Sequence, residues 1–315
     1  TQYQNAGDWP SPPTIALFGG GIKNIGTNVL NSISTLSLDT LGNASDYADL
    51  SVNRYNLASC SSSGKAIFAG GRSSSSVRLV SIDEIGFSGG GTASDFGDLS
   101  TITIYSAGSG NSIRGIFAGG FDASASRINS IEYISLASSG NALDFGDMSY
   151  NAERGAACAS STRSILMPAF DIGAGSPYLT NVIEYVTIAT TGNSLDFGDA
   201  TVSRYQGASC SSATRGVYLG GEVSGGYTNV VDYVTMASTG NAADFGDLSA
   251  SKGQAGATSN SVKGVIGGGQ PEATIGNVIE FITFATTGNS SDFGDLDANE
   301  WTQMAACSNA HGGLS

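Results

Sequence analysis

The sequence has few basic residues and a single histidine. Its 315 residues include 13 Lys and Arg against 27 Asp and Glu, so the formal charge is −14 at pH 7. Because binding to phosphates requires clustered Lys and Arg, this balance argues against nucleic acid and anionic membranes as partners. No apolar run approaches the roughly 18 residues of a membrane span, so we expect no membrane insertion. The chain starts at Thr1 rather than Met, and we expect a processed or truncated start.

The shortage of histidine also limits the chemistry. A Ser-His-Asp triad would have to use His311, the only histidine. The four cysteines form neither a CxxC pair nor a zinc-type spacing; they are Cys60, Cys158, Cys210 and Cys307. We therefore predict no catalytic residues, no metal site and no cofactor. Hydrolysis by two carboxylates stays open as an alternative, since 27 residues are acidic.

What the chain does have is an internal repeat. An Asp-aromatic-x-Asp motif occurs six times, with first Asp residues 49, 49, 52, 48 and 48 residues apart. A period of this length is typical of solenoids, propellers or arrays. The repeats are anchored at Asp46, Asp95, Asp144, Asp196, Asp244 and Asp292.

Each repeat has the signals of four short strands. In the fifth, residues 214–221 are an apolar run ending in Gly-Gly, and residues 229–237 are rich in β-branched and aromatic side chains. A Gly-Asn pair before the next "DFGD" predicts a tight hairpin. Residues 14–21 match the second strand of a unit, and residues 301–310 match the first.

These features predict an all-β fold, a six-bladed β-propeller with four antiparallel strands per blade. We expect the C-terminal strand to pair with the N-terminal blade, since pairing of this kind closes the ring and leaves only short edges. The predicted domains are an N-terminal arm over residues 1–13 and the propeller over residues 14–315. The cysteines occupy the position that Ser109 and Thr258 hold in other repeats, which indicates small buried residues rather than disulfides or metal ligands.

The repeat resembles the kelch repeat of β-propeller proteins. The shared features are "IFAGG" (residues 116–120), "IEYI" (131–134), "DFGDM" (144–148), and Arg54 and Arg204. This chain departs from the pattern with Phe or Tyr where kelch units have Trp, and with Thr103 in place of one Arg. A copper oxidase of the kelch type would need at least two histidine ligands, which this chain lacks.

The segment "NVIEYVTIATTGNSLDFGD" resembles the sequences of repeats in structural proteins of tailed marine phages. This resemblance implies a virion surface component, either a tail fibre with receptor-binding capacity or a capsid decoration. It implies other virion proteins as partners, and a host cell-surface glycan or protein as a ligand. A homo-oligomer is one alternative for the assembly, and the oligomeric state stays open.

Two charged features have alternative interpretations. The Asp-aromatic-Gly-Asp motif is either a calcium site or a structural element in which Asp caps a turn and Phe packs between blades. The basic residues that open the second strands and the acidic residues of the third strands are either rings for a ligand or ion pairs that set blade register. We favour the structural interpretation of both, because the features recur in nearly every unit.

Binding residues are expected where the repeat symmetry breaks. In an antiparallel blade, the loops after the Gly-Gly pairs lie on one rim, and these loops all differ; variable loops on a rigid scaffold commonly carry binding. The fourth unit differs most, with Pro168-Ala169 in place of Gly-Gly and a longer loop at 170–180. The candidate ligand-binding residues are Lys23, Arg72, Phe121, Asp122, Phe170, Tyr178, Tyr227 and Gln270.

From these observations we predict a non-enzymatic binding or structural module on a phage particle. The alternative is a propeller-fold carbohydrate-active enzyme, a glycosidase or lyase that acts on host surface polysaccharide.

Overall fold

The computed structural model describes residues 13–23, 28–101, 103–176, 178–271, 276–297 and 301–314. The prediction of an all-β protein is confirmed. Among the described residues the helical elements are two short 3-10 turns, η1 (Ile172–Ala174) and η2 (Gly312–Leu314). The predicted N-terminal arm lies, except for Pro13, outside the described residues.

The strands form six principal sheets, each built around four antiparallel strands. From the innermost strand outward, sheet 1 contains β33 (Ala305–Ser308), β1 (Ile15–Gly19), β4 (Ser32–Ser37), β5 (Ser45–Asp49) and the edge strand β11 (Gly91–Thr92). Sheet 2 contains β7 (Ala58–Ser61), β8 (Lys65–Ala69), β10 (Ser81–Gly86) and β12 (Ser94–Asp98). Sheet 3 contains β13 (Ala107–Gly110), β14 (Arg114–Ala118), β15 (Ile128–Ser135), β16 (Leu143–Glu153) and the edge strand β19 (Phe170–Asp171).

The other three sheets repeat this order without an added edge strand. Sheet 4 contains β17 (Ala157–Ala159), β18 (Arg163–Leu166), β20 (Val182–Thr187) and β21 (Leu195–Asp199). Sheet 5 contains β22 (Ala208–Ser211), β23 (Arg215–Leu219), β26 (Val230–Thr235) and β27 (Ala243–Asp247). Sheet 6 contains β28 (Gly256–Ser259), β29 (Lys263–Gly267), β30 (Val278–Thr283) and β31 (Ser291–Asp295). Short accessory strands are β2 (Ile22–Lys23), β3 (Asn28–Val29), β6 (Arg54–Tyr55), β9 (Arg72–Ser73), β24 (Glu222–Val223), β25 (Gly226–Tyr227) and β32 (Trp301–Thr302).

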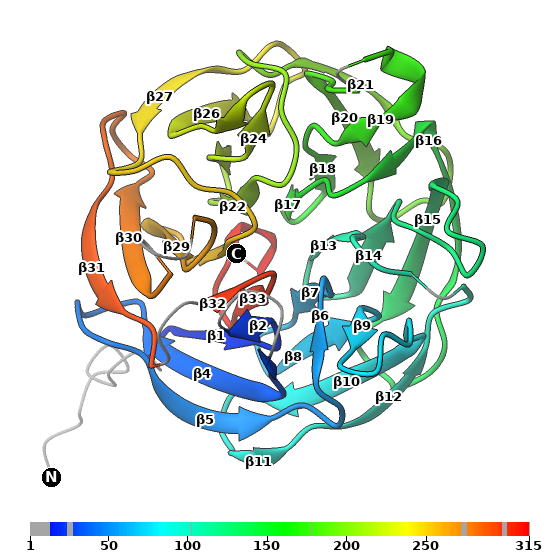
Figure 1. The fold of residues 1–315 in the computed structure, drawn as a ribbon, viewed down its shortest axis with the longest axis vertical. Coiled ribbons are helices and arrows are strands. Elements are labelled where there is room, and N and C mark those ends of the chain that lie inside the picture. The colour runs from blue at the N-terminus through cyan, green and yellow to red at the C-terminus, as the bar shows by residue number, and fades with distance from the viewer. Residues whose placement is uncertain are drawn as a thin grey trace, which may run out of the picture.

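The six sheets stand around a common centre, near which the C-terminus lies (Figure 1). The innermost strands contact one another in the order β33, β7, β13, β17, β22, β28, and β28 in turn contacts β33. The expected pairing of the two ends of the chain is present, since β33 pairs antiparallel with β1 and places Cys307 opposite Leu17. Sheet 1 therefore depends on strands from both ends of the sequence.

The aromatic motif forms a bulge in the outermost strand. In sheet 3 the pairing with β15 passes over Phe145, because Gly146 lies opposite Ile131 and Asp144 lies opposite Glu132. An inserted residue of this kind bends the strand. It turns Phe145 into the core, where its ring meets Tyr133 edge-on with centroids 5.9 Å apart. The first Asp of every motif is exposed.

The Gly-Asn pairs connect adjacent sheets rather than forming tight hairpins. β15 ends at Ser135 and β16 begins at Leu143, so the connection is a longer loop. The side chain of Asn193 accepts a hydrogen bond from the backbone N–H of Asp147 in the preceding sheet (3.0 Å). Gly146 has φ 148°, and a Cβ there would lie 2.4 Å from the carbonyl oxygen of Gly192. The same Asp-to-Asn bond joins four of the other five motifs, as Asp98–Asn141, Asp199–Asn241, Asp247–Asn289 and Asp295–Asn43.

The charged residues have a structural role, but their partners differ from those predicted. Three acidic residues of the third strands pair with a basic residue that precedes the first strand: Arg54–Asp83 (3.0 Å), Arg204–Asp232 (3.0 Å) and Lys252–Glu280 (2.8 Å). The bases that open the second strands instead cover an aromatic ring. Arg163, for example, stacks over Tyr185 at 4.8 Å and donates to the carbonyl oxygen of Met236 in the next sheet.

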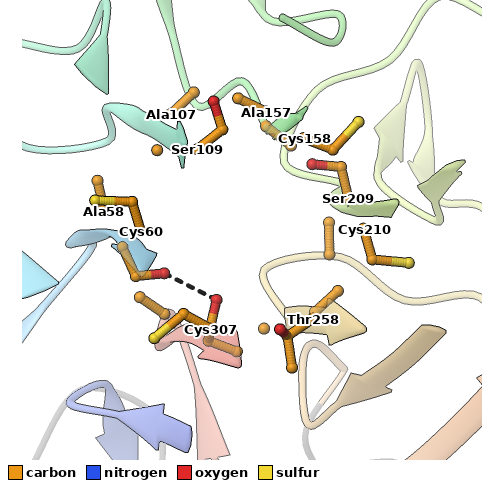
Figure 2. A pocket seen from close by; sticks show the side chains of 18 of the residues that line it. Ala58, Cys60, Ala107, Ser109, Ala157, Cys158, Ser209, Cys210, Thr258 and Cys307 are labelled. Atoms are coloured by element: carbon orange, nitrogen blue, oxygen red, sulfur yellow. Dashed lines mark hydrogen bonds between the residues drawn. The ribbon is translucent and has the colours of Figure 1, made fainter. Parts of the chain in front are cut away.

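The four cysteines are buried and free. The innermost strands surround a small cavity, and Figure 2 shows the cysteine sulfur atoms pointing away from its middle. A Cβ on Gly216 would lie 2.9 Å from Cys158 Sγ, and one on Gly264 would lie 2.4 Å from Cys210 Sγ. Cys60 Sγ is likewise 2.4 Å from the position of a Cβ on Gly115, so these three thiols fill the space above a glycine of the next sheet, as a small apolar side chain does.

The thiols are expected to be inert while the protein is folded. Burial raises the pKa of Cys158 and of Cys307 to about 12, and it raises those of Cys60 and Cys210 well above the ordinary value. Since the thiolate is the nucleophile, a chromogenic disulfide reagent should leave the native protein unlabelled at pH 8 and titrate four thiols in denaturant. Rapid labelling of the native protein would contradict this burial.

Candidate functional site

The variable loops lie where the second strands end, and each one contacts the segment that leads into the first strand of its own sheet. β9, after the second strand of sheet 2, pairs with β6, which precedes the first strand. Single bridges make the same connection at Ile104–Phe121, Tyr205–Glu222 and Gly253–Gln270. We call this end of the six sheets the variable rim.

The structure brings some of the predicted site residues together and leaves others in separate loops. Lys23 pairs with Trp301 beside sheet 1, and Arg72 donates from Nε to the carbonyl oxygen of Ser76 in the sheet 2 loop (3.3 Å). The carboxylate of Asp122 accepts from the N–H groups of Ser124 and Ser126 within its own loop. Gln270 bridges Gly253 in sheet 6. These contacts place the four residues around different parts of the rim.

Phe121, Phe170 and Tyr178 do come together, with Arg127 between them. The Arg127 guanidinium lies 4.9 Å from the ring centroid of Phe121 and 4.7 Å from that of Phe170. Its Nε and Nη2 donate to one oxygen of Glu153, at 3.0 and 2.7 Å. Phe170 also stands 5.5 Å from Tyr178, ring to ring.

The cluster continues toward the centre of the molecule. Phe170 packs edge-on against Tyr205 at 5.2 Å, and the guanidinium of Arg154 lies 4.4 Å above the ring of Tyr105. We use the name rim cluster for Tyr105, Phe121, Arg127, Glu153, Arg154, Phe170, Tyr178 and Tyr205. It covers sheets 3, 4 and 5, and it includes the long loop of the fourth unit.

A second feature, which the sequence did not reveal, surrounds the centre of the rim. One residue per sheet has a left-handed backbone, with φ between 55° and 64°: Asn56, Tyr105, Arg154, Gln206, Gln254 and Gln303. Each backbone N–H donates to the carbonyl oxygen of the residue before it in this series, and Asn56 donates to Gln303, at distances of 2.8–3.0 Å. The result is an unbroken cycle of hydrogen bonds, which we call the axial ring.

The side chains of the axial ring surround a cavity of about 90 Å³, here called the mouth cavity. Gln303 Nε2 donates to Gln254 Oε1 (2.8 Å), and Gln254 Nε2 donates to Gln206 Oε1 (3.0 Å). Tyr227, one of the predicted site residues, reaches this ring, since its hydroxyl accepts from Gln254 Nε2 at 3.4 Å. The amides of Gln206, Gln254 and Gln303 thus line one part of the mouth cavity, and the rim cluster supplies Tyr105 and Arg154 to its lining.

Two polar groups of the axial ring are buried without a hydrogen-bond partner. They are Asn56 Nδ2 and Arg154 Nε, and both residues line the mouth cavity. Burial lowers the pKa of Arg154, but its interactions with Tyr105 and Glu153 outweigh this effect and raise the pKa overall, so the side chain remains cationic. Buried donors that lack partners are costly, which makes this cavity a place where a ligand acceptor is stabilising.

Below the mouth cavity is an inner cavity of about 150 Å³, lined by the small side chains of the innermost strands (Figure 2). His311 also lines this inner cavity. The turn η2 contacts β17 and β22, so the C-terminal residues pack against the inner strands. Burial lowers the pKa of His311 to about 4. The imidazole is therefore neutral near pH 7, where it does not serve as a proton donor.

The arrangement is suited to binding. Among the described residues no group of three or more His, Cys, Asp or Glu is placed to hold a metal ion. In the same part of the chain, no helix is long and apolar enough to cross a membrane. The axial ring was missed because its six residues are of four types. The available signal was the shared position of Asn56, Gln206 and Gln254, two residues after Arg54, Arg204 and Lys252.

No protein-family model matches the chain, and a search of curated proteins found no significant match.

Proposed function

We propose that this chain is a six-bladed β-propeller of the kelch type and serves as a non-enzymatic binding module. The propeller assignment is supported by the cyclic contacts of the innermost strands and by the pairing of β1 with β33. It is also supported by the axial ring of hydrogen bonds. A closed arrangement of this kind provides a rigid scaffold on which loops can vary.

The observation that carries the binding function is the rim cluster. It gathers five aromatic rings and two arginines from sheets that otherwise repeat closely, and Tyr178 in it is 39% exposed. Aromatic and arginine side chains held at fixed distances are the groups that commonly contribute most to a binding surface. The long loop of the fourth unit builds this cluster, so the departure from the repeat creates the proposed site.

We place the module on the surface of a phage particle. This part of the proposal rests on the resemblance of the repeat sequence to repeats in structural proteins of tailed marine phages. In this setting the variable rim faces a host glycan or protein, and the opposite, more uniform rim contacts other virion proteins. A net charge of −14 is consistent with a particle surface that does not bind nucleic acid.

Replacing residues 170–180 with the loop sequence of residues 72–76 tests the site. The exchange removes Phe170 and Tyr178, so Arg127 loses one of its two aromatic contacts. We expect adsorption of particles that carry the variant to host cells to fall at least tenfold, with the melting temperature lowered by only a few degrees.

The matched control replaces residues 74–76, in a variable-rim loop outside the rim cluster, with Gly-Ser-Gly, and it should adsorb like the unaltered protein. Unchanged adsorption after the 170–180 exchange would remove that loop from the site. Release of sugars from host polysaccharide by the purified protein would contradict the non-enzymatic assignment.

A further inference from the structure

The mouth cavity presents hydrogen-bond donors and offers few free acceptors. The six backbone carbonyl groups of the axial ring already accept from one another. Asn56 Nδ2 and Arg154 Nε are buried donors without a hydrogen-bond partner. Among the described residues that line the mouth cavity, none is acidic. A ligand group placed there must therefore bring acceptors, and a negative charge fits beside a guanidinium better than a neutral group does.

Arg154 is the charged group of this cavity, and its surroundings leave it available. Glu153 lies behind it, with Oε2 at 3.8 Å from Arg154 Nε, but the carboxylate is already bound by Arg127 at 2.7 Å through its other oxygen. The side chain of Tyr205 hydrogen-bonds both Arg154 and Glu222. Arg154 thus keeps one partly shared carboxylate neighbour, whereas the buried Arg54 and Arg204 each have a carboxylate oxygen at 3.0 Å.

The position of Arg154 among the aromatic rings favours a sugar as the carrier of the carboxylate. Tyr105 lies under the guanidinium at 4.4 Å, and Tyr205 stands 6.0 Å from it. On the opposite side of the cavity the amides of Gln206, Gln254 and Gln303 form a row. Amides that both donate and accept match sugar hydroxyls. A cavity of about 90 Å³ above one of about 150 Å³ accommodates one sugar residue rather than a chain.

We propose that the mouth cavity binds the terminal acidic sugar of a glycan, with the sugar carboxylate on Arg154 and Asn56, and the sugar hydroxyls on the glutamine row. This inference deepens the proposed function, because it assigns a ligand class to the centre of the same rim. It also locates that ligand on the axis rather than on the outer loops.

The chain itself supplies a conservative variant for the test. Gln occupies the equivalent position in three sheets with φ between 57° and 59°, against 58° for Arg154. Arg154→Gln therefore keeps a side chain that this backbone conformation already accommodates, and it removes only the charge and the guanidinium. Arg78→Gln changes the net charge equally, but Arg78 binds the carbonyl oxygens of Asp122 and Ala123 and does not line the cavity.

The experiment is titration calorimetry of the protein with methyl glucuronide and with methyl glucoside. The two sugars differ in that only the glucuronide has a carboxylate. We expect saturable binding of the glucuronide at least tenfold tighter than that of the glucoside. Arg154→Gln should reduce the glucuronide affinity at least tenfold, to the level of the glucoside, and Arg78→Gln should leave it unchanged. Asn56→Asp, which places a negative charge beside the ligand, should also weaken binding of the glucuronide.

Equal affinity for the two sugars, no binding of either, or an unchanged affinity in Arg154→Gln would each overturn the inference. The outcome is separable from that of the proposed function. If the 170–180 loop exchange loses adsorption while Arg154→Gln leaves the glucuronide affinity unchanged, the rim is still supported as a binding surface. The acidic-sugar site is then ruled out.

Discussion

A chain that ends before Trp301 is expected to lose cooperative folding. The deletion removes β32 and β33, and with them the innermost strand of sheet 1. Phe18 and Leu17, both fully buried, then lose the partner strand on one side of β1. The axial ring is opened as well, because Gln303 accepts from Asn56 and donates to Gln254. We expect no sharp thermal transition in circular dichroism, and binding of a hydrophobic dye.

Substitutions of Trp301 in the full-length chain separate the contribution of its buried volume from that of its indole hydrogen bond. Its side chain is fully buried, and its indole N–H donates to the carbonyl oxygen of Gly20. Trp301→Ala should cost about 3–5 kcal/mol of unfolding free energy. Trp301→Phe keeps most of the volume and should cost less, about 1–3 kcal/mol for the orphaned carbonyl. A truncated chain that melts as sharply as the intact protein would contradict a structural role for the terminal pairing.

The second large effect is expected at the Lys252–Glu280 pair. Both side chains are almost fully buried, and Lys252 Nζ lies 2.8 Å from Glu280 Oε2. Lys252→Met leaves a buried carboxylate without its counter-ion, which should cost about 3–5 kcal/mol at pH 7. Urea unfolding followed by tryptophan fluorescence measures this loss. The double variant Lys252→Met with Glu280→Gln should recover most of it, because the unpaired charge is gone.

The cost of Lys252→Met should shrink as the pH falls. Burial raises the pKa of Glu280, but Lys252 and Ser249 outweigh it, and the pKa is lowered. The stability from a lowered carboxyl pKa is present above the unfolded pKa and is lost as the pH falls through the folded value. Without Lys252, burial dominates, as at Glu132, whose pKa is raised where Thr103 replaces the base. A raised carboxyl pKa destabilises the folded state above the unfolded pKa, and this penalty disappears as the pH falls below both pKa values. A cost that grows from pH 7 to pH 4 would contradict this reasoning.

The internal comparison shows that the ion pair is one of several solutions for the same site. Sheet 3 has Thr103 where the base stands, and Glu132 there accepts hydrogen bonds from Ser100 instead. At the start of sheet 1 the equivalent positions hold the buried Trp301 and Ser34. A buried pair can be exchanged for apolar packing without loss of the fold, and the repeats of this chain contain both forms.

The sequence alone determined the strand content, the period and the pairing of the chain ends. Alternation of apolar residues and recurring glycine turns act locally, within a few residues, so they can be read without coordinates. The burial of the cysteines was also predictable, because Ser109 and Thr258 hold the same position in other repeats. The aromatic members Phe121, Phe170 and Tyr178 were identified by the variability of their loops.

Only the tertiary structure decided which groups meet. The sequence assigned Asn193 to a hairpin, whereas its side chain binds Asp147 of the neighbouring sheet. It gave no sign that Arg127 lies between Phe121 and Phe170, or that Asn56 donates to Gln303, far away along the chain. These contacts cross from one sheet to the next, so they depend on the arrangement of the sheets around their common centre. Periodicity fixes what each repeat forms by itself, and long-range packing fixes which side chains of different repeats lie within bonding distance.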